Sequence, residues 1–290
     1  MAIQERELKS FAALQLDEPE TLTRLKTLMA PVEFKVAVTG TRPGVGVSTF
    51  TLNLALALRH AQSEGLETDL GRTPRIGILD LGGSTFPHRL GRESHALERR
   101  GSRLRPARGL EDIKVVSMDM LMRDRFRGGM AGLRDWNVVR ESLGQVDWDE
   151  LDLLLVEFPP GIEAVEDLSE VLPAIDAGLI VSRPGDGERE RIRRLWRFFD
   201  VSSTPAIALI SNMEGRNKGE TVETLGGTFG IPIRVAIPHE PALATFQAGT
   251  APYVLAQKGT EVRRTFFDLS EDLVEYLVWL HDEHEDEEDF

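Results

Sequence analysis

The residues best suited to chemistry lie in a glycine-rich turn between two apolar segments. The turn contains Gly44, Val45 and Gly46 and leads into the hydroxyl residues Ser48 and Thr49. Glycines let backbone N–H groups converge on an anion, and the N-terminus of a helix adds partial positive charge. A hydroxyl at this place can also join the ligand shell of a phosphate-bound Mg²⁺. The turn predicts a cradle for phosphate groups, although a structural turn without a ligand would use the same glycines.

Two residues depart from the usual phosphate-binding pattern. Thr41 stands where the first glycine belongs, and Val47 stands where a lysine belongs. That lysine carries the full positive charge that reaches the β- and γ-phosphates. A hydrogen bond to a charged group contributes roughly 1.5–3 kcal/mol, so its loss weakens binding by about one to two decades. Hydrolysis should suffer more, because charge stabilisation at the γ-phosphate is the main catalytic contribution.

Short apolar, β-branched runs alternate with helical patterns along the chain, which is typical of a parallel sheet covered on both faces. The fold class expected is therefore α/β, a doubly wound and mostly parallel sheet with helices on both faces. The expected strands are Lys35–Thr39, Arg75–Leu79, Ile113–Ser117, Leu151–Glu157, Ala177–Ser182, Ala206–Ser211 and Pro232–Ala236. The expected helices are Ser48–Gln62, Asp135–Leu143, Val165–Leu172, Gly187–Phe199, Thr221–Phe229 and Val262–Leu280. Long surface loops are expected at 63–74 and 89–110.

The chain divides into three parts on its patterning. Residues 1–33 predict an N-terminal helical arm, because leucines recur there at helical spacing. Residues 34–280 predict a single α/β domain, since no linker interrupts them. Residues 281–290 carry seven carboxylates and predict a solvated acidic tail, with docking to a basic partner as the alternative.

Charge and composition exclude several function classes. The net charge of −14 argues against nucleic acid and anionic membrane surfaces as partners. No apolar run reaches the roughly 18–20 residues that span a bilayer, and the first residues do not resemble a signal peptide. We therefore expect a cytoplasmic protein. Arginines crowd residues 89–108, which we interpret as a mobile loop, with an anion or partner site as the alternative.

The order of several segments resembles the MinD/ParA class of deviant P-loop ATPases, and within it the Mrp family of iron–sulfur cluster carrier ATPases. The loop GKGGVGKST of that family corresponds to residues 41–49, which read TRPGVGVST. Further matching stretches are Gly77–Asp80, Pro87–Gly91, IKVVSMDML at 113–121, VDWDELDLLLVEFPPG at 146–161, Ile210–Met213, Ile237–Ala242 and Gly249–Pro252. The resemblance covers roughly residues 34–255, and it implies that the single domain of residues 34–280 is P-loop NTPase-like.

The resemblance implies roles for the residues of the loop. The backbone from Gly44 to Thr49, including Val45, Gly46 and Val47, would hold the phosphates of ATP or ADP, and Ser48 would bind Mg²⁺. Arg42 stands where the class has a lysine that crosses a dimer interface to the phosphates of the partner. An arginine keeps the charge in that role, whereas the alternative is a solvent-exposed loop residue.

The same resemblance implies two carboxylates and a base site. Asp80 matches the first aspartate of the switch, and Glu157 replaces the aspartate that ends the Walker B strand, so both would act in catalysis and at Mg²⁺. The second switch carboxylate has no counterpart in Leu81 and Gly82. Asn212 and the stretch around Pro238 would border the adenine, with a strand-end turn as the alternative for Asn212.

One property of the Mrp family is chemically excluded. The family holds a bridging cluster through a Cys-x-x-Cys, whereas this chain contains no cysteine. It cannot supply thiolate ligands to an iron–sulfur cluster by itself.

The sequence is compatible with three functions. The first is a nucleotide-binding protein with weak or absent hydrolysis that acts as a regulatory or assembly partner, as a homodimer or as a mixed dimer with a cysteine-bearing homologue. The second is a nucleotide-free pseudo-ATPase that serves as an interaction module. The third is an active localisation or maturation ATPase of the ParA/MinD type.

Overall fold

The computed structural model describes residues 32–61, 72–82, 97–125, 143–161, 174–214, 220–244 and 251–288. Eight strands form one sheet in the order β10-β9-β8-β1-β7-β2-β6-β5. The strands of this sheet are β1 (Val32–Gly40), β2 (Ile76–Asp80), β5 (Ala107–Arg108), β6 (Lys114–Ser117), β7 (Leu151–Glu157), β8 (Ala177–Ser182), β9 (Ala206–Glu214) and β10 (Ile233–Pro238). All neighbouring pairs are parallel except β5 with β6, which confirms the mostly parallel α/β sheet.

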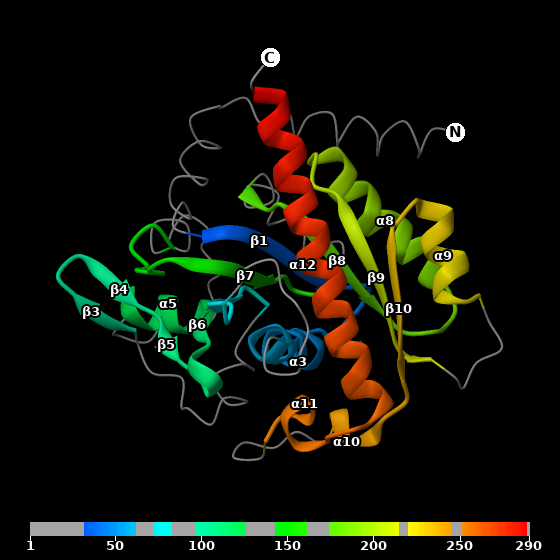
Figure 1. Ribbon diagram of the computed structural model, residues 1–290, viewed down its shortest axis with the longest axis horizontal. Helices are drawn as coiled ribbons and strands as arrows, with labels where there is room; N and C mark the ends of the chain where they lie inside the picture. The colour runs from blue at the N-terminus through cyan, green and yellow to red at the C-terminus, as the bar shows by residue number, and fades with distance from the viewer. Residues whose placement is uncertain are drawn as a thin grey trace.

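Helices cover both faces of the sheet (Figure 1). On one face lie α3 (Val47–His60), α11 (Tyr253–Ala256) and α12 (Glu261–Glu288), with α10 (Pro241–Ala244) following β10 in the chain. On the other lie α5 (Met118–Arg125), α8 (Glu188–Val201) and α9 (Val222–Phe229). Alternate residues of each strand serve the two layers, as the pleat requires: Val36 and Val38 pack toward α3 and α12, and Ala37 packs toward the other face.

The central strands are buried along their whole length. In β7 and β8 every residue is buried, which explains why their near-continuous apolar runs predicted their bounds correctly. The remaining predicted strands are confirmed with shifted ends; for example, β9 continues from Ser211 to Glu214. Strands that are covered on both faces must be apolar throughout, so their sequence signal is strong.

The loop predicted at 89–110 is wrong over its second half. The antiparallel pair β3 (Glu98–Arg100) and β4 (Arg103–Arg105) turns at Gly101, which has φ +63°, and β5 follows. Leu104 is fully buried between two exposed arginines, so the alternation of a strand is present. A high density of arginine is common to loops and to exposed strands, so the single buried Leu104 is the only residue that distinguishes the two in β4.

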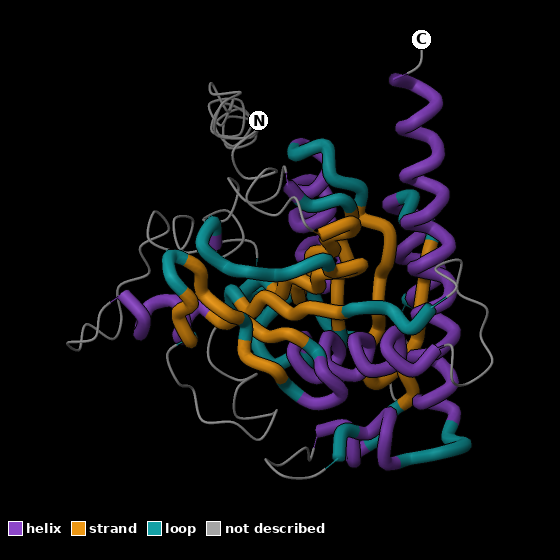
Figure 2. Tube along the Cα trace, turned by 60° about the vertical axis from the view of Figure 1, so that its left-hand side comes forward, coloured by secondary structure: helices purple, strands orange, loops and turns teal. Residues whose placement is uncertain are grey.

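The ends of the chain also differ from the expected boundaries. Val32 and Glu33 belong to β1, so the domain begins before residue 34, and residues 1–31 of the expected arm lie outside the described part. The expected tail is helical up to Glu288, because α12 continues through it without a break. Figure 2 shows that the end of α12 extends beyond the strands. The predicted helices Asp135–Leu143 and Val165–Leu172 fall outside the described residues, apart from Leu143.

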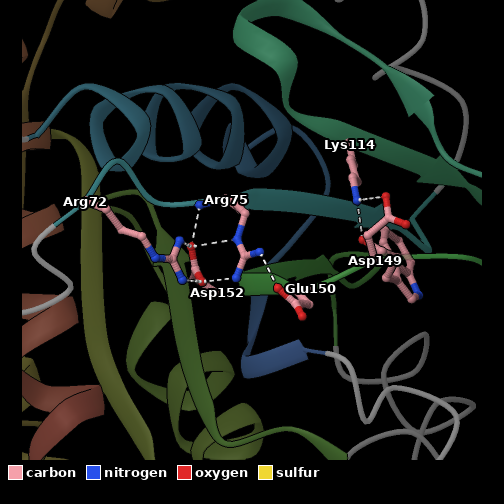
Figure 3. A network of polar contacts seen from close by, with 7 residues as sticks. Arg72, Arg75, Lys114, Asp149, Glu150 and Asp152 are labelled. Atoms are coloured by element: carbon pink, nitrogen blue, oxygen red, sulfur yellow. Dashed lines mark hydrogen bonds and ion pairs between the residues drawn. The ribbon is translucent and has the colours of Figure 1, made fainter.

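A charged network ties the amino ends of β2 and β7 together (Figure 3). Asp152 accepts hydrogen bonds from Arg72 Nη1 at 2.7 Å, from the backbone N of Arg75 at 2.6 Å and from Arg75 Nη2 at 3.0 Å. Arg75 also pairs with the exposed Glu150 at 2.9 Å. Burial by itself raises the pKa of Asp152, but the hydrogen bonds from both arginines lower that pKa to about 2.

Candidate functional site

The glycine-rich turn joins the carboxyl end of β1 to the head of α3, where sequence analysis expected a phosphate cradle. Gly44 and Gly46 have φ of +79° and +99°, which favours glycine at both positions. Gly46 is the N-cap of α3, and no side chain caps the helix. The N-cap residue thus contributes no side chain to the first turn of α3, and the helix dipole places partial positive charge at this end.

Two valines fill the inside of the turn. Val45 is fully buried and Val47 is 6% exposed. A Cβ atom on Gly40 would lie 2.5 Å from Val47 Cγ2 and 2.6 Å from Val45 Cγ2, so only glycine fits at the end of β1. The side chain at the usual lysine position is thus part of the hydrophobic core, and this position brings no cation to the turn.

Ser48, Asp80 and Glu157 come together at the carboxyl end of the sheet. Asp80 and Glu157 are register partners at the ends of β2 and β7, and both side chains lie on the face covered by α3. Ser48 Oγ donates a hydrogen bond of 2.5 Å to Glu157 Oε1. Asp80 is fully buried and Glu157 is 4% exposed. These hard oxygen donors are of the type that Mg²⁺ prefers.

Asn212 lies beside the turn near the end of β9, and Pro238 lies at the end of the neighbouring strand β10. Asn212 Nδ2 donates to the carbonyl oxygen of Val45 at 2.9 Å. A Cβ atom on Gly46 would come within 2.5 Å of the same nitrogen. Asn212 is therefore in contact with the turn, where it fixes the backbone. Pro238 ends β10, one residue after the register partner of Asn212. Thr49 lies in the first turn of α3, and its carbonyl oxygen accepts from Asn53 Nδ2.

Arg42 makes a contact with the first residue of α8 that sequence analysis did not foresee, although the helix itself was predicted. Its Nε donates to Glu188 Oε1 at 2.9 Å, and Arg191 Nη1 donates to the same oxygen at 2.8 Å. Glu188 is the first residue of α8 and is 4% exposed, although most glutamates at this place in a helix face solvent. The glycines at 185 and 187, which mark a turn before a helix, were the available signal. Arg42 is therefore not simply a solvent-exposed loop residue, because a buried carboxylate binds its guanidinium group.

A cavity of about 600 Å³ lies beside this contact, at the carboxyl ends of β8 and β9. It is lined by Ser182, Arg183, Pro184, Gly185, Asp186, Gly187, Glu188, Arg189, Ser211, Glu220, Val222 and Leu225. The segment 215–219, where the Cys-x-x-Cys of the Mrp family would fall, lies outside the described residues. In the part of the chain that the structure describes, no helix is long and apolar enough to cross a bilayer.

By sequence, this chain is similar to proteins of iron–sulfur cluster transfer and assembly. Residues 31–274 match the ParA family described as NUBPL iron-transfer P-loop NTPase. Over 270 residues the chain is 23% identical to an iron-sulfur cluster carrier protein of Saccharolobus solfataricus, with 88% of this chain and 87% of that protein covered. It is 29% identical over 251 residues to the chloroplastic Fe-S cluster assembly factor HCF101 of Arabidopsis thaliana, covering 81% of this chain and 44% of that longer protein.

Solved structures have the same fold. A nucleotide-binding protein from Archaeoglobus fulgidus, in complex with ADP, superposes with a TM-score of 0.57 at 24% identity over 78% of this chain and 90% of that chain. The MinD cell division protein of Aquifex aeolicus gives a TM-score of 0.58 at 20% identity over 83% and 96%. The family match spans most of the residues and the fold agrees with it, so this chain belongs to the ParA family of NUBPL iron-transfer P-loop NTPases.

Proposed function

We propose that this chain binds ATP or ADP with Mg²⁺ at the turn between β1 and α3. The observation that carries the proposal is the uncapped head of α3 beside the Ser48–Glu157 pair: main-chain donors for phosphate adjoin oxygen ligands for a cation. In this role the backbone from Gly44 to Thr49 binds phosphate, Ser48 and the two carboxylates hold Mg²⁺ directly or through water, and Asn212 and Pro238 border the base. Bound Mg²⁺ would neutralise phosphate charge.

We infer that hydrolysis is weak or absent. The buried Val47 leaves the γ-phosphate without the loop cation that stabilises transferred charge. Asp80 and Glu157 remain as candidate catalytic groups, but Leu81 and Gly82 supply no second switch carboxylate. Nucleotide binding can persist on main-chain donors alone, whereas efficient turnover needs the missing charge.

With no cysteine, the chain cannot carry a cluster by the thiolate route. The matched relatives are an iron-sulfur cluster carrier and an Fe-S cluster assembly factor. We therefore propose a regulatory or assembly role in the cytoplasm beside such proteins, as a homodimer or as a mixed dimer with a cysteine-bearing homologue. In a mixed dimer the cluster would be cargo held by the thiolates of the other subunit.

Titration calorimetry with ADP and with a non-hydrolysable ATP analogue, each with and without Mg²⁺, tests the binding proposal. We expect weak binding that Mg²⁺ strengthens. Ser48→Ala should remove the Mg²⁺ effect, and Ser102→Ala, in the exposed turn between β3 and β4, should leave it unchanged. Absence of heat and of any thermal shift at millimolar nucleotide contradicts the proposal. A steady-state ATPase rate that Ser48→Ala abolishes would favour an active ATPase instead.

A second candidate is a nucleotide-free interaction module. It is favoured by the two valines packed inside the turn and by the Asn212 amide, which is already engaged with Val45. Val47→Lys separates the candidates. If the backbone is still shaped for phosphate, the new ammonium raises nucleotide affinity, by up to about one to two decades. If affinity does not change while the variant stays folded by circular dichroism, the module is the better description.

A further inference from the structure

A groove separate from the P-loop lies where the second half of α12 passes the start of β10 and the head of α9. Its volume is about 580 Å³. It is lined by Glu223, Pro232, Ile233, Arg234, Asp272, Glu275, Tyr276 and Trp279. β10 is the last strand of the sheet on this side, so the groove follows an outer border of the domain. Helix α12 packs against β10 on this side of the sheet.

Aromatic surface is exposed in the groove although the same helix buries its other face. Trp279 is 48% exposed, and its ring centroid lies 5.4 Å from that of the partly buried Tyr276. On the opposite side of α12, Leu273 and Leu277 are buried in the core. The indole of Trp279 is therefore not part of the hydrophobic core on this face. A large exposed aromatic residue in a concave site is typical of a surface that a partner covers.

The charge of the groove is negative and is only partly balanced from within. Glu223, Asp272 and Glu275 are exposed, and the one cation among the lining residues, Arg234, donates its Nη1 to the carbonyl oxygen of Ile231 at 2.9 Å. Partial desolvation of its carboxyl group, with repulsion from Glu275 and Asp268, raises the pKa of Asp272 even though the residue is exposed as a whole.

The same negative charge continues along the helix. Beyond Trp279, α12 extends to Glu288 through a sequence with six carboxylates: Asp282, Glu283, Glu285, Asp286, Glu287 and Glu288. The groove residues of α12 are therefore followed in the chain by an acidic helical segment. A ligand that carries positive charge would meet attraction both in the groove and along this segment.

We propose that this groove docks a segment of another protein in which arginine or lysine stands next to an apolar residue. The cation would stack on Trp279 and Tyr276 and pair with the carboxylates of α12, while the apolar neighbour would contact Ile233. A guanidinium over an indole gains about 0.5–2 kcal/mol, depending on how far it is desolvated. Nucleic acid and anionic lipid carry the wrong charge for this surface. The site lies outside the P-loop, so docking does not depend on the proposed nucleotide binding.

The test is fluorescence anisotropy of a labelled peptide that alternates arginine and leucine, titrated with the full chain. Trp279→Ala should weaken binding about tenfold, the upper part of the range for a cation–aromatic contact. The double variant Asp272→Asn with Glu275→Gln should also weaken it and should reduce its dependence on salt. Val201→Ala, which removes another exposed apolar side chain at the end of α8, is the matched control and should change nothing.

Three results would overturn the proposal. The first is equal affinity for the wild type and for Trp279→Ala, with circular dichroism confirming that both are folded. The second is equal affinity for a control peptide that alternates glutamate and leucine, which would mean that only apolar contact counts. The third is a dimer in sedimentation that Trp279→Ala converts to a monomer, because the groove would then be the interface with a second copy.

Discussion

The two ends of strand β7 each bury a carboxylate, and the two carboxylates are held in opposite ways. At the amino end, Asp152 is 1% exposed and is bound by two guanidinium groups and a backbone N–H (Figure 3). At the carboxyl end, Glu157 is 4% exposed and accepts from the neutral hydroxyl of Ser48. Glu157 lies beside a second buried carboxylate, Asp80, and next to the uncapped head of α3.

The different partners indicate different roles: Asp152 stabilises the fold, whereas Glu157 is suited to binding a ligand. Charge-assisted hydrogen bonds from arginines stabilise a buried carboxylate and occupy the oxygens that would otherwise bind a ligand. Two neighbouring carboxylates with a hydroxyl make a set of oxygens that a divalent cation can complete. Glu157 lies at the carboxyl end of β7, where a parallel sheet collects the loops that carry functional groups, whereas Asp152 lies at the amino end.

The largest effect that this comparison predicts is on stability. Asp152→Ala should lower the free energy of unfolding by about 3 kcal/mol, because two arginines and a backbone N–H lose their buried acceptor. Urea unfolding followed by circular dichroism measures this change. Nucleotide affinity, measured under native conditions, should remain the same.

The matched control for this change is Glu150→Ala. Glu150 pairs with Arg75 at 2.9 Å, but its side chain is 85% exposed, so its loss should be hardly measurable. A loss at Glu150 as large as that at Asp152 would contradict the assignment of the stabilisation to the buried carboxylate.

A somewhat smaller effect should appear on acidification. The pKa of Asp152 is about 2 in the folded chain, against about 3.9 for an unfolded aspartate. A lowered pKa gives stability that is present above the unfolded pKa and is lost as the pH falls through the folded pKa. Between about pH 4 and pH 2 the wild type should therefore lose about 2 kcal/mol that Asp152→Asn does not lose. Parallel pH curves for the two proteins would rule this out.

Next in size is the effect at the other end of β7. Glu157→Gln keeps an acceptor for Ser48 but removes the charge, so Mg²⁺ should lose about tenfold of its contribution to nucleotide affinity, or about 1.4 kcal/mol. The free energy of unfolding should stay constant or rise, because a buried charge disappears. Calorimetry with and without Mg²⁺, together with urea unfolding, checks both parts. A loss of stability similar to that of Asp152→Ala would make Glu157 a structural residue, and the two ends of β7 would then not differ in role.

The part of the fold that is predictable from sequence is the part that is buried on both faces. β7 and β8 were predicted to the residue because strands covered by helices on both sides must be apolar throughout. The hairpin β3–β4 was missed because it is exposed, and only Leu104 carries its pattern. The end of α12 was missed because consecutive carboxylates give no amphipathic period, although a helix already under way continues through them.

In the candidate site, the local geometry was predictable and the long-range contacts were not. The turn and the hydroxyl of Ser48 follow from a short segment of sequence, and the two strand-end carboxylates follow from the family resemblance. The contacts of Arg42 with Glu188 and of Asn212 with Val45 join residues 146 and 167 positions apart. Only the sheet order, in which β8 lies beside β1, brings α8 next to the turn. Periodicity within a segment carries no information on such pairs.

Glu188 provides an intermediate case and the smallest predicted effect on stability. Like Asp152 it is buried and bound by two guanidinium groups, from Arg42 and Arg191, but it lies next to the turn at the carboxyl edge. Arg42 is 40% exposed, so solvent screens much of the pair. Arg42→Ala should therefore lower the free energy of unfolding by less than about 1 kcal/mol, since Arg191 still serves the same oxygen. Arg42→Lys is the matched control, because it keeps the charge and loses the planar fork.

If Arg42 also binds phosphate across a dimer, nucleotide affinity should fall in Arg42→Ala by more than the change in stability explains, and sedimentation with nucleotide should show less dimer. A fall of about 3 kcal/mol in the free energy of unfolding, as expected for Asp152→Ala, would instead show that the contact of Arg42 with Glu188 mainly stabilises the fold.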